Sequence, residues 1–161
     1  MNILTPLAVR IGAISWMPKL LPQITATDKF IQRVSKGRVT ILDIAGLPNL
    51  MLTVNGRKSG VPRTTPLLCV PYESGNLIAG SNFGGPKLPV WVVNVRAAEE
   101  KGERVGVRAD GRSQQAAVRE LSGAERDRAW EHMIKIWPNY ARYAERTART
   151  IPVFLLDTSQ G

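Results

Sequence analysis

Three basic side chains lie close together in a segment rich in turn-forming residues. Arg57, Lys58 and Arg63 belong to residues 55–66, which read Asn-Gly-Arg-Lys-Ser-Gly-Val-Pro-Arg-Thr-Thr-Pro. Arginine forms two-pronged hydrogen bonds with phosphate or carboxylate groups, and lysine adds a point charge. Neighbouring hydroxyl and backbone groups supply further donors, at Ser59, Gly60, Thr64 and Thr65. The segment is a candidate anion-binding site, although a solvated basic hairpin would explain the same residues.

The chain around this basic segment predicts a β-hairpin. Asn55 and Gly56 both tolerate the positive φ angles of a primed turn, which makes Asn-Gly the strongest short-range hairpin signal. Apolar runs flank the turn, Leu50–Leu52 before it and Leu67–Val70 after it. The hairpin would therefore fix the direction in which the basic side chains point.

Length and charge limit the class of protein. A chain of 161 residues corresponds to about one domain, which can form a core without disulfides or metals. The net charge of +9 favours an anionic partner: nucleic acid, an acidic membrane surface or a polyanionic small molecule. No aromatic-interleaved or recognition-helix pattern accompanies the scattered basic residues, so nucleic acid is not expected.

The single cysteine and the single histidine are expected to have structural roles. Cys69 lies in an apolar run, which favours a small buried side chain and a reducing cytoplasm. His132 has no cysteine or histidine nearby that could complete a metal site with it, and the sequence indicates no acyl-transfer triad. We expect Cys69 in the core, His132 on a helix surface and no bound metal.

Residues 1–37 are expected to form a helical leader, and residues 38–161 the main domain. Apolar residues recur near the N-terminus at mostly helical spacing. This pattern fits either an interfacial helix, with residues 1–24 on the inner membrane face, or a helix packed on its own domain. We expect a cytoplasmic protein without a secretory signal or a membrane span. Thr25 or Thr27 could cap a short helix over 28–35.

Short apolar segments bounded by Gly, Pro, Asn or Asp predict a largely antiparallel β structure. The links 73–76 and Asp110-Gly111 are predicted hairpin turns. Strands are expected over residues 39–44, 50–54, 64–70, 77–81, 104–109, 112–121 and 151–156. The pattern favours an α+β or mainly β fold, with a small barrel of about six antiparallel strands flanked by helices.

Three further helical segments are expected between these strands. The Gly- and Pro-rich residues 82–89 lead into a helix over 90–97, and such a bend is a further place for an anion or a flat ring. A capping-box spacing, Ser122 to Glu125, opens a second helix. Its core-facing stripe is expected to consist of Trp130, Met133, Ile134 and Trp137.

The third helical segment follows directly. It is expected over residues 139–148, where Tyr140 and Tyr143 are three positions apart and therefore share one face. Barrel packing with surface hydroxyl groups would explain the two tyrosines without any chemical role.

Four segments together resemble the deazaflavin-dependent nitroreductase family. They are residues 56–67, 80–94, 137–143 (Trp-Pro-Asn-Tyr-Ala-Arg-Tyr) and 149–153 (Arg-Thr-Ile-Pro-Val). The resemblance implies a split β-barrel that binds coenzyme F420, a deazaflavin with a phosphate and an oligoglutamate tail. It also implies hydride transfer from the reduced cofactor to an electron-poor acceptor, namely a quinone, a nitroaromatic compound or an activated enone.

The same resemblance implies the cofactor contacts. Cations and hydroxyls of the basic segment match positions that hold the phosphate and the tail, and Trp91 matches a position that packs near the ring. In full, the implied cofactor-binding residues are Arg57, Lys58, Ser59, Arg63, Thr64, Thr65, Pro66, Leu67, Leu68, Ala79, Gly80, Ser81, Asn82, Lys87, Val90, Trp91, Val92, Val93, Asn94 and Tyr140.

On the acceptor side, the resemblance implies catalytic roles for Ser81, Tyr140 and Tyr143. A hydroxyl beside a developing oxyanion can donate a hydrogen bond or a proton. Leu68, Leu88 and Val92 replace aromatic or polar residues of relatives, which predicts a more aliphatic acceptor pocket. The alternative is a non-catalytic carrier that binds flavin, haem or fatty acid at a membrane surface. In either case we expect a monomer or a weak dimer.

Overall fold

The computed structural model describes residues 21–34 and 46–159, together with the single positions 6, 10, 19 and 42. Most of the predicted leader therefore lies outside the described residues. So does the strand expected over 39–44, except for Leu42, whose backbone is helical. Within the part of the chain that is described, no helix combines the length and the apolar character needed to cross a bilayer.

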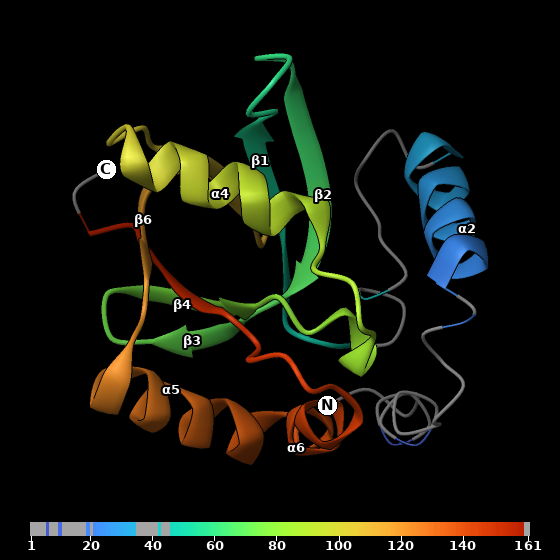
Figure 1. Ribbon diagram of the computed structural model, residues 1–161. Coiled ribbons are helices and arrows are strands. Elements are labelled where there is room, and N and C mark those ends of the chain that lie inside the picture. The colour runs from blue at the N-terminus through green and yellow to red at the C-terminus, as the bar shows by residue number, and fades with distance from the viewer. Residues whose placement is uncertain are drawn as a thin grey trace.

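Seven strands form one curled antiparallel sheet (Figure 1). They are β1 (Asn49–Asn55), β2 (Pro62–Leu68), β3 (Val70–Tyr72), β4 (Gly75–Ala79), β5 (Val105–Ala109), β6 (Arg112–Glu120) and β7 (Val153–Asp157). Their order across the sheet is β2-β1-β5-β6-β7-β4-β3, and every neighbouring pair is antiparallel. The predicted antiparallel sheet flanked by helices is confirmed, with one strand more than expected.

Positive backbone angles lie at the predicted hairpin turns 73–76 and 110–111. Asp110 (φ 49°) and Gly111 (φ 73°) link β5 to β6, and Glu73 (φ 47°) lies between β3 and β4. The β1–β2 hairpin also forms, but its predicted primed turn at Asn55-Gly56 is wrong. The connection runs over residues 56–61, and the positive angle lies at Gly60 (φ 68°), because Gly56 N–H bonds to the carbonyl of Val61 at 2.9 Å.

The strand predicted over 64–70 is divided in the structure. Cys69 interrupts it: its N–H donates to the carbonyl of Pro48 at 3.1 Å in register with the β1–β2 pairing, but Pro48 has no N–H to return the bond, so the ladder ends there. The interruption lets β2 and β3 reach opposite edges of the sheet. Cys69 itself is buried as expected, and burial raises the pKa of its thiol to about 12.

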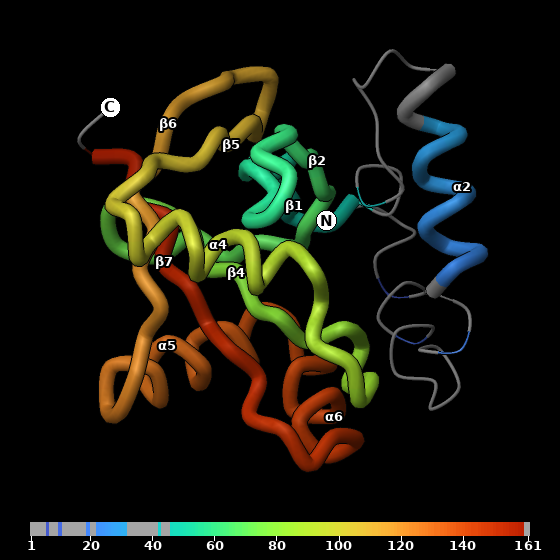
Figure 2. The backbone as a smooth tube through the Cα atoms, turned by 45° about the horizontal axis from the view of Figure 1, so that its top comes forward, coloured from blue at the N-terminus to red at the C-terminus, as the bar shows by residue number. Residues whose placement is uncertain are grey.

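Two clusters of buried side chains hold the helices to opposite faces of the sheet. Helix α4 (Val90–Glu100) covers one face, with Leu50, Leu52, Val105 and Val107 beneath it. Helices α5 (Gly123–Ile136) and α6 (Asn139–Arg146) cover the other, around Leu77, Met133 and Leu155. Figures 1 and 2 show β4 and β7 between these two helical layers. The predicted stripe of Trp130, Met133, Ile134 and Trp137 packs in the second cluster.

Two helix starts differ from expectation. Helix α2 (Leu21–Val34) begins well before the predicted 28–35, so Thr25 and Thr27 lie inside it, where Thr27 bonds to the carbonyl of Gln23. Ser122 does occupy the position before α5, yet no capping box forms. Glu125 is instead bound by both terminal nitrogens of Arg119, at 2.7 Å each, which removes the acceptor that the capping box needs. His132 lies on α5, partly buried, with its Nε2 3.1 Å from the carbonyl oxygen of Pro71.

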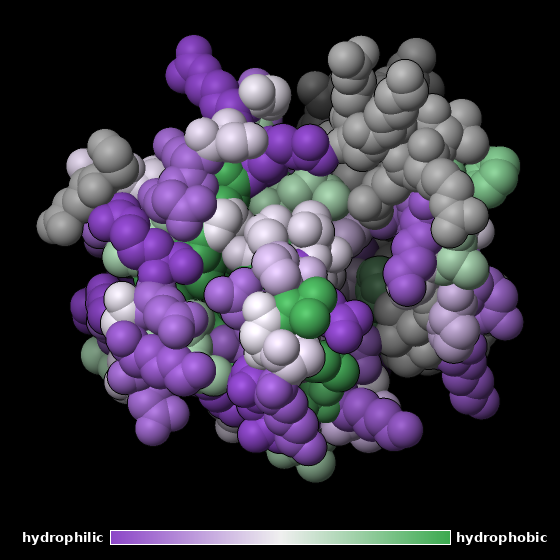
Figure 3. Space-filling view, turned by 90° about the horizontal axis from the view of Figure 1, so that it is seen from above, coloured by the Kyte–Doolittle hydropathy of each residue, from purple (hydrophilic) through white to green (hydrophobic). Residues whose placement is uncertain are grey.

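Hydrophilic residues dominate the face seen from above in Figure 3, and apolar residues form only small separate patches on it. Of the large apolar side chains in the described part, Phe30, Val61, Val90 and Ile136 are the exposed ones. Because they belong to different elements, they do not suggest one continuous apolar surface.

Candidate functional site

The basic hairpin holds three exposed cations at one end of the sheet. Arg57 and Lys58 lie in the 56–61 connection, and Arg63 lies on β2. Within the described ranges none of the three forms an ion pair, since the salt bridges found there join other residues. Ser59 caps the connection by accepting the N–H of Val61 at 3.2 Å. The hairpin therefore presents positive charge that the described part of the chain leaves uncompensated.

One hydrogen bond ties this hairpin to helix α4. The backbone N–H of Arg57 donates to Oδ1 of Asn94 at 3.0 Å. Asn94 is a buried polar side chain, 6% exposed, on the sheet-facing side of α4. Because a buried amide needs a partner, this bond fixes the base of the basic connection against the helix.

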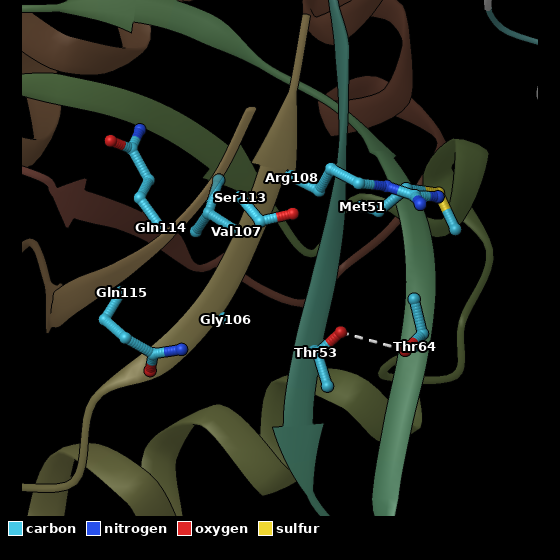
Figure 4. A pocket seen from close by; sticks show the side chains of 9 residues that line it. All are labelled: Met51, Thr53, Thr64, Gly106, Val107, Arg108, Ser113, Gln114 and Gln115. Atoms are coloured by element: carbon cyan, nitrogen blue, oxygen red, sulfur yellow. Dashed lines mark hydrogen bonds between the residues drawn. The ribbon is translucent and has the colours of Figure 1, made fainter. Parts of the chain in front are cut away.

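The pleat of β2 separates predicted cofactor-binding residues onto two faces. Arg63, Thr65 and Leu67 pair with core residues of β1 and so share the face covered by α4. Thr64, Pro66 and Leu68 alternate with them and point to the opposite face. Thr64 bonds there to Thr53 at 2.9 Å (Figure 4). The side chains of residues 63–68 therefore cannot all line one site.

That opposite face contains an open depression of about 530 Å³ over β1, β2, β5 and β6 (Figure 4). Its lining is mostly polar and includes Thr53, Thr64, Arg108, Ser113 and Gln115. Of the predicted cofactor-binding residues, Thr64 alone lines it. The depression therefore lies apart from the α4 face on which Arg63, Thr65 and Leu67 are placed.

A tight loop follows β4 and contains predicted ring-lining residues. Gly80 packs so closely that a Cβ there would lie 2.7 Å from Val92 Cγ2 and 2.9 Å from Pro152 Cγ. Beyond it, Asn82 (φ 48°), Phe83 (φ 53°) and Gly84 (φ 78°) are successive residues with left-handed backbone. Such angles are costly for non-glycine residues and persist only where the surroundings impose them.

Helix α4 turns its predicted site residues in different directions. Val90 is 76% exposed, whereas Trp91, Val92 and Asn94 face the core. Trp91 packs edge-to-face on Phe154, with ring centroids 5.9 Å apart. Val93 is partly buried, and Lys87, before the helix, is exposed. A ring bound at this helix would therefore meet the edge of the core rather than an exposed tryptophan face.

The two predicted catalytic tyrosines belong to α6 and pack into the second core cluster. Tyr140 is 2% exposed and Tyr143 is 1% exposed, with their rings in an edge-to-face arrangement 6.0 Å apart. Burial raises the pKa of both hydroxyls, and for Tyr143 the neighbouring Trp137 and Arg146 side chains oppose that shift. Phe83 links the pair to the loop, since its ring is 5.7 Å from that of Tyr143. Both hydroxyls are thus held in the neutral, proton-bearing form.

Two arginines that sequence reasoning gave no role bind the same loop. Arg149 donates to the carbonyls of Gly80, Ser81 and Gly85, and Arg146 donates to the carbonyl of Phe83. Because all these acceptors are backbone groups, no side-chain pattern could have indicated the contacts. Arg149 belongs to the segment 149–153 that resembled the family, which was the one available signal.

The four segments of the sequence resemblance thus meet in space. The hairpin reaches α4 through Arg57 and Asn94, the loop after β4 reaches α6 through Phe83 and Tyr143, and Arg149 closes the same loop. Among the residues that the structure describes, no group of three His, Cys, Asp or Glu side chains could hold a metal ion.

Comparison with known proteins gives a consistent result. The model of the F420H(2)-dependent quinone reductase family matches residues 25–158. An F420H(2)-dependent quinone reductase of Mycobacterium tuberculosis is 30% identical over 137 residues, which are 83% of this chain and 89% of the relative.

Solved structures agree. An F420-H2 dependent reductase, FDR-A, is 34% identical with a TM-score of 0.61, over 68% of this chain and 94% of its own. A structure described as a domain-swapped dimer is 30% identical with a TM-score of 0.63, over 83% and 95% of the two chains. HutZ, a heme storage protein of Vibrio cholerae, shares the fold alone, at 11% identity and a TM-score of 0.52.

These matches confirm the split β-barrel and the deazaflavin-dependent resemblance expected from the four segments. The match extends further toward the N-terminus than the resemblance did, because it includes residues of α2. The chain belongs to the F420H(2)-dependent quinone reductase family.

Proposed function

We propose that the protein reduces a quinone, and that the cations of the basic hairpin bind the anionic end of its deazaflavin cofactor. The observation on which this rests is the set of exposed, uncompensated charges at Arg57, Lys58 and Arg63, fixed to α4 by the bond from Arg57 to Asn94. The anionic end of the cofactor carries a phosphate and several carboxylates. A row of cations can bind it in competition with water, because charge-assisted hydrogen bonds are stronger than neutral ones.

As a member of its family the protein is an F420H2-dependent oxidoreductase, and its cofactor is reduced coenzyme F420. The bound deazaflavin supplies the hydride, so the residues of this chain have to orient it and exclude water. The donor set supports this role. Arg63 and Thr65 share the α4 face of β2. A cofactor whose anionic end is bound by Arg57 and Arg63 would therefore extend from the exposed hairpin toward α4.

On the acceptor side, the proposed hydrogen-bond donors are Ser81, Tyr140 and Tyr143. Reduction of a quinone to a hydroquinone takes up one hydride and one proton, and negative charge develops on a quinone oxygen as the hydride arrives. Neutral hydroxyl donors stabilise that charge. The raised pKa values of both tyrosines keep them in the donor form. Leu88, which packs against the first core cluster, and the buried Val92 within it are aliphatic and would suit an apolar quinone bound next to them.

The test is anaerobic mixing of the protein with reduced F420 and menadione, followed by absorbance as the cofactor is oxidised. Oxidation well above the uncatalysed rate is expected. A nitroaromatic compound and an activated enone, run in parallel, would show whether the quinone is preferred. Equal rates with and without the protein for all three acceptors would overturn the proposal.

The non-catalytic carrier is not favoured. The matches at about 30% identity are to reductases, whereas the heme storage protein shares only the fold. Three further predictions remain proposals: the division of the chain at residue 37, the monomeric or weakly dimeric state, and the contact of residues 1–24 with the inner membrane face. Size-exclusion chromatography with light scattering would test the oligomeric state, for which the domain-swapped relative makes a dimer the alternative outcome.

A further inference from the structure

A single guanidinium group holds the loop after β4 by three backbone carbonyls. Arg149 donates from Nη1 to Gly80 at 2.9 Å, from Nη2 to Ser81 at 3.0 Å and from Nε to Gly85 at 3.2 Å. Residues 80 and 85 are the two ends of the loop. The planar fork of arginine presents donors in fixed directions, so these three bonds set the distance and angle between the two ends.

The loop that Arg149 closes would not be expected to keep its shape without such contacts. Asn82 and Phe83 have left-handed backbone, at φ 48° and 53°, in which L side chains are unfavourable. The N–H groups of Gly84 and Gly85 bond back to Ser81 and Asn82 at 2.8 Å each, which closes the turn on itself.

Arg149 differs from Arg96 and Arg119 in having no carboxylate partner among the described residues. Arg96 and Arg119 both bind carboxylates at 2.7 Å, whereas no carboxylate within the described ranges forms an ion pair with Arg149. Partial burial lowers the pKa of Arg149, which shows that its guanidinium is partly removed from water. The described partners of that charge are neutral carbonyls, which compensate the loss of hydration less than a carboxylate would.

We propose that Arg149 is a positioning residue for cofactor binding, which holds the loop 80–85 in the shape that receives the deazaflavin ring. The inference rests on the proposed function, because the ring-lining role of Gly80, Ser81 and Asn82 is part of it. Arg146 assists from the same side through the carbonyl of Phe83 at 3.3 Å.

The experiment compares Arg149→Met, Arg149→Lys and the exposed control Arg128→Met with the unmodified protein. Hydrogen exchange is measured first, without cofactor, at the Gly84 and Gly85 amides. Cofactor affinity is then measured from the fluorescence of oxidised F420, and KM and kcat from turnover with reduced F420 and menadione. Melting temperatures establish that each variant is folded at the assay temperature.

For Arg149→Met we expect faster exchange at both amides and a rise of roughly tenfold in Kd and KM for F420, because several charge-assisted hydrogen bonds are lost. Arg149→Lys keeps the charge but cannot reach three divergent carbonyls. Its Kd and KM should therefore lie between those of the unmodified protein and those of Arg149→Met. The control should match the unmodified protein. A residue that only stabilised the fold would lower the melting temperature and leave Kd and KM unchanged.

Three results would overturn the inference. The first is hydrogen exchange at Gly84 and Gly85 in Arg149→Met at the same rate as in the unmodified protein. The second is a Kd and KM of Arg149→Met equal to those of the unmodified protein. The third is a Kd, KM and kcat of Arg149→Lys equal to those of the unmodified protein. Failure of the underlying function looks different, because the unmodified protein itself would then neither bind F420 nor oxidise its reduced form. In that case the role in cofactor binding is refuted as well, whatever the exchange measurement shows about the loop.

Discussion

The backbone N–H of Arg57 and the side-chain oxygen of Asn94 are joined by a hydrogen bond of 3.0 Å, across 37 residues of sequence. Asn94 is almost fully buried, whereas Arg57 is exposed. The bond therefore transmits the position of a rigid helix to a solvent-facing connection. It links the two parts of the proposed site, the basic hairpin and the helix proposed to border the ring.

Replacing Asn94 with alanine should loosen that link. Loss of one neutral hydrogen bond corresponds to about 1 kcal/mol, so we expect F420 affinity to fall by roughly three- to tenfold. Hydrogen exchange at the Arg57 amide should accelerate in the same variant. Glu100→Ala, at the exposed end of α4, is the matched control and should change neither quantity. An unchanged Arg57 amide in Asn94→Ala would show that the hairpin is held by other contacts.

Lys58→Ala and Arg63→Ala should each weaken F420 binding by about 1–3 kcal/mol, because each removes charge-assisted hydrogen bonds to the anionic end. The loss should shrink as salt is raised, since the charges are exposed and screened. Fluorescence titration at two ionic strengths measures both effects. Lys135→Ala, which removes an exposed cation at the end of α5, serves as control. If it weakened binding as much as the hairpin variants, overall charge rather than the hairpin would explain the affinity.

Tyr140→Phe should lower turnover while leaving F420 affinity nearly intact. Burial raises the pKa of Tyr140 above its ordinary value near 10, so the hydroxyl stays protonated at every pH below that value. For the same reason its contribution to stability is complete below about pH 10 and is lost progressively as the pH rises from there through the raised pKa. The measurement is kcat against pH from 6 to 9. A deprotonation step in that range that disappears in Tyr140→Phe would contradict the assignment, and a large fall in affinity would move Tyr140 to the cofactor.

Gly84→Ala should destabilise the fold considerably more than Gly102→Ala. Both glycines have positive φ, at 78° and 67°, so both substitutions suffer the same backbone strain. At Gly84, however, a Cβ would lie 2.6 Å from the carbonyl oxygen of Tyr143, whereas at Gly102 nothing lies within 4 Å. We expect about 1 kcal/mol for Gly102→Ala and about 1–3 kcal/mol more for Gly84→Ala, by urea denaturation. Equal losses would show that the loop can move away from α6 without cost.

The elements with local signals could be predicted from the sequence. Asp110-Gly111 indicated a turn because few other residues accept its angles, and the stripe from Trp130 to Trp137 indicated the buried face of α5 because of its helical period. Both signals lie within a few residues of the feature that they predict. The resemblance over four segments supplied the cofactor, which composition and charge left undecided.

What the sequence could not give depends on contacts between distant residues. The break at Cys69 follows from its strand partner Pro48, which has no N–H to continue the ladder, and the missing capping box follows from competition by Arg119 for Glu125. The two faces of β2 were not separated either, because assigning a continuous segment to the cofactor overlooked the pleat. Arg149 was missed since its partners are backbone carbonyls, which have no residue type to recognise.

The central claim is that the hairpin cations recognise the anionic end of the cofactor. Its most direct test compares the Kd of F420 with that of the same deazaflavin lacking the phosphate and the glutamates. The comparison is made for the unmodified protein and for a variant with alanine at Arg57, Lys58 and Arg63. We predict a strong preference for F420 in the unmodified protein and its loss in the variant, with the affinity for the tailless compound unchanged. A variant that still prefers F420 by the same factor would contradict the account.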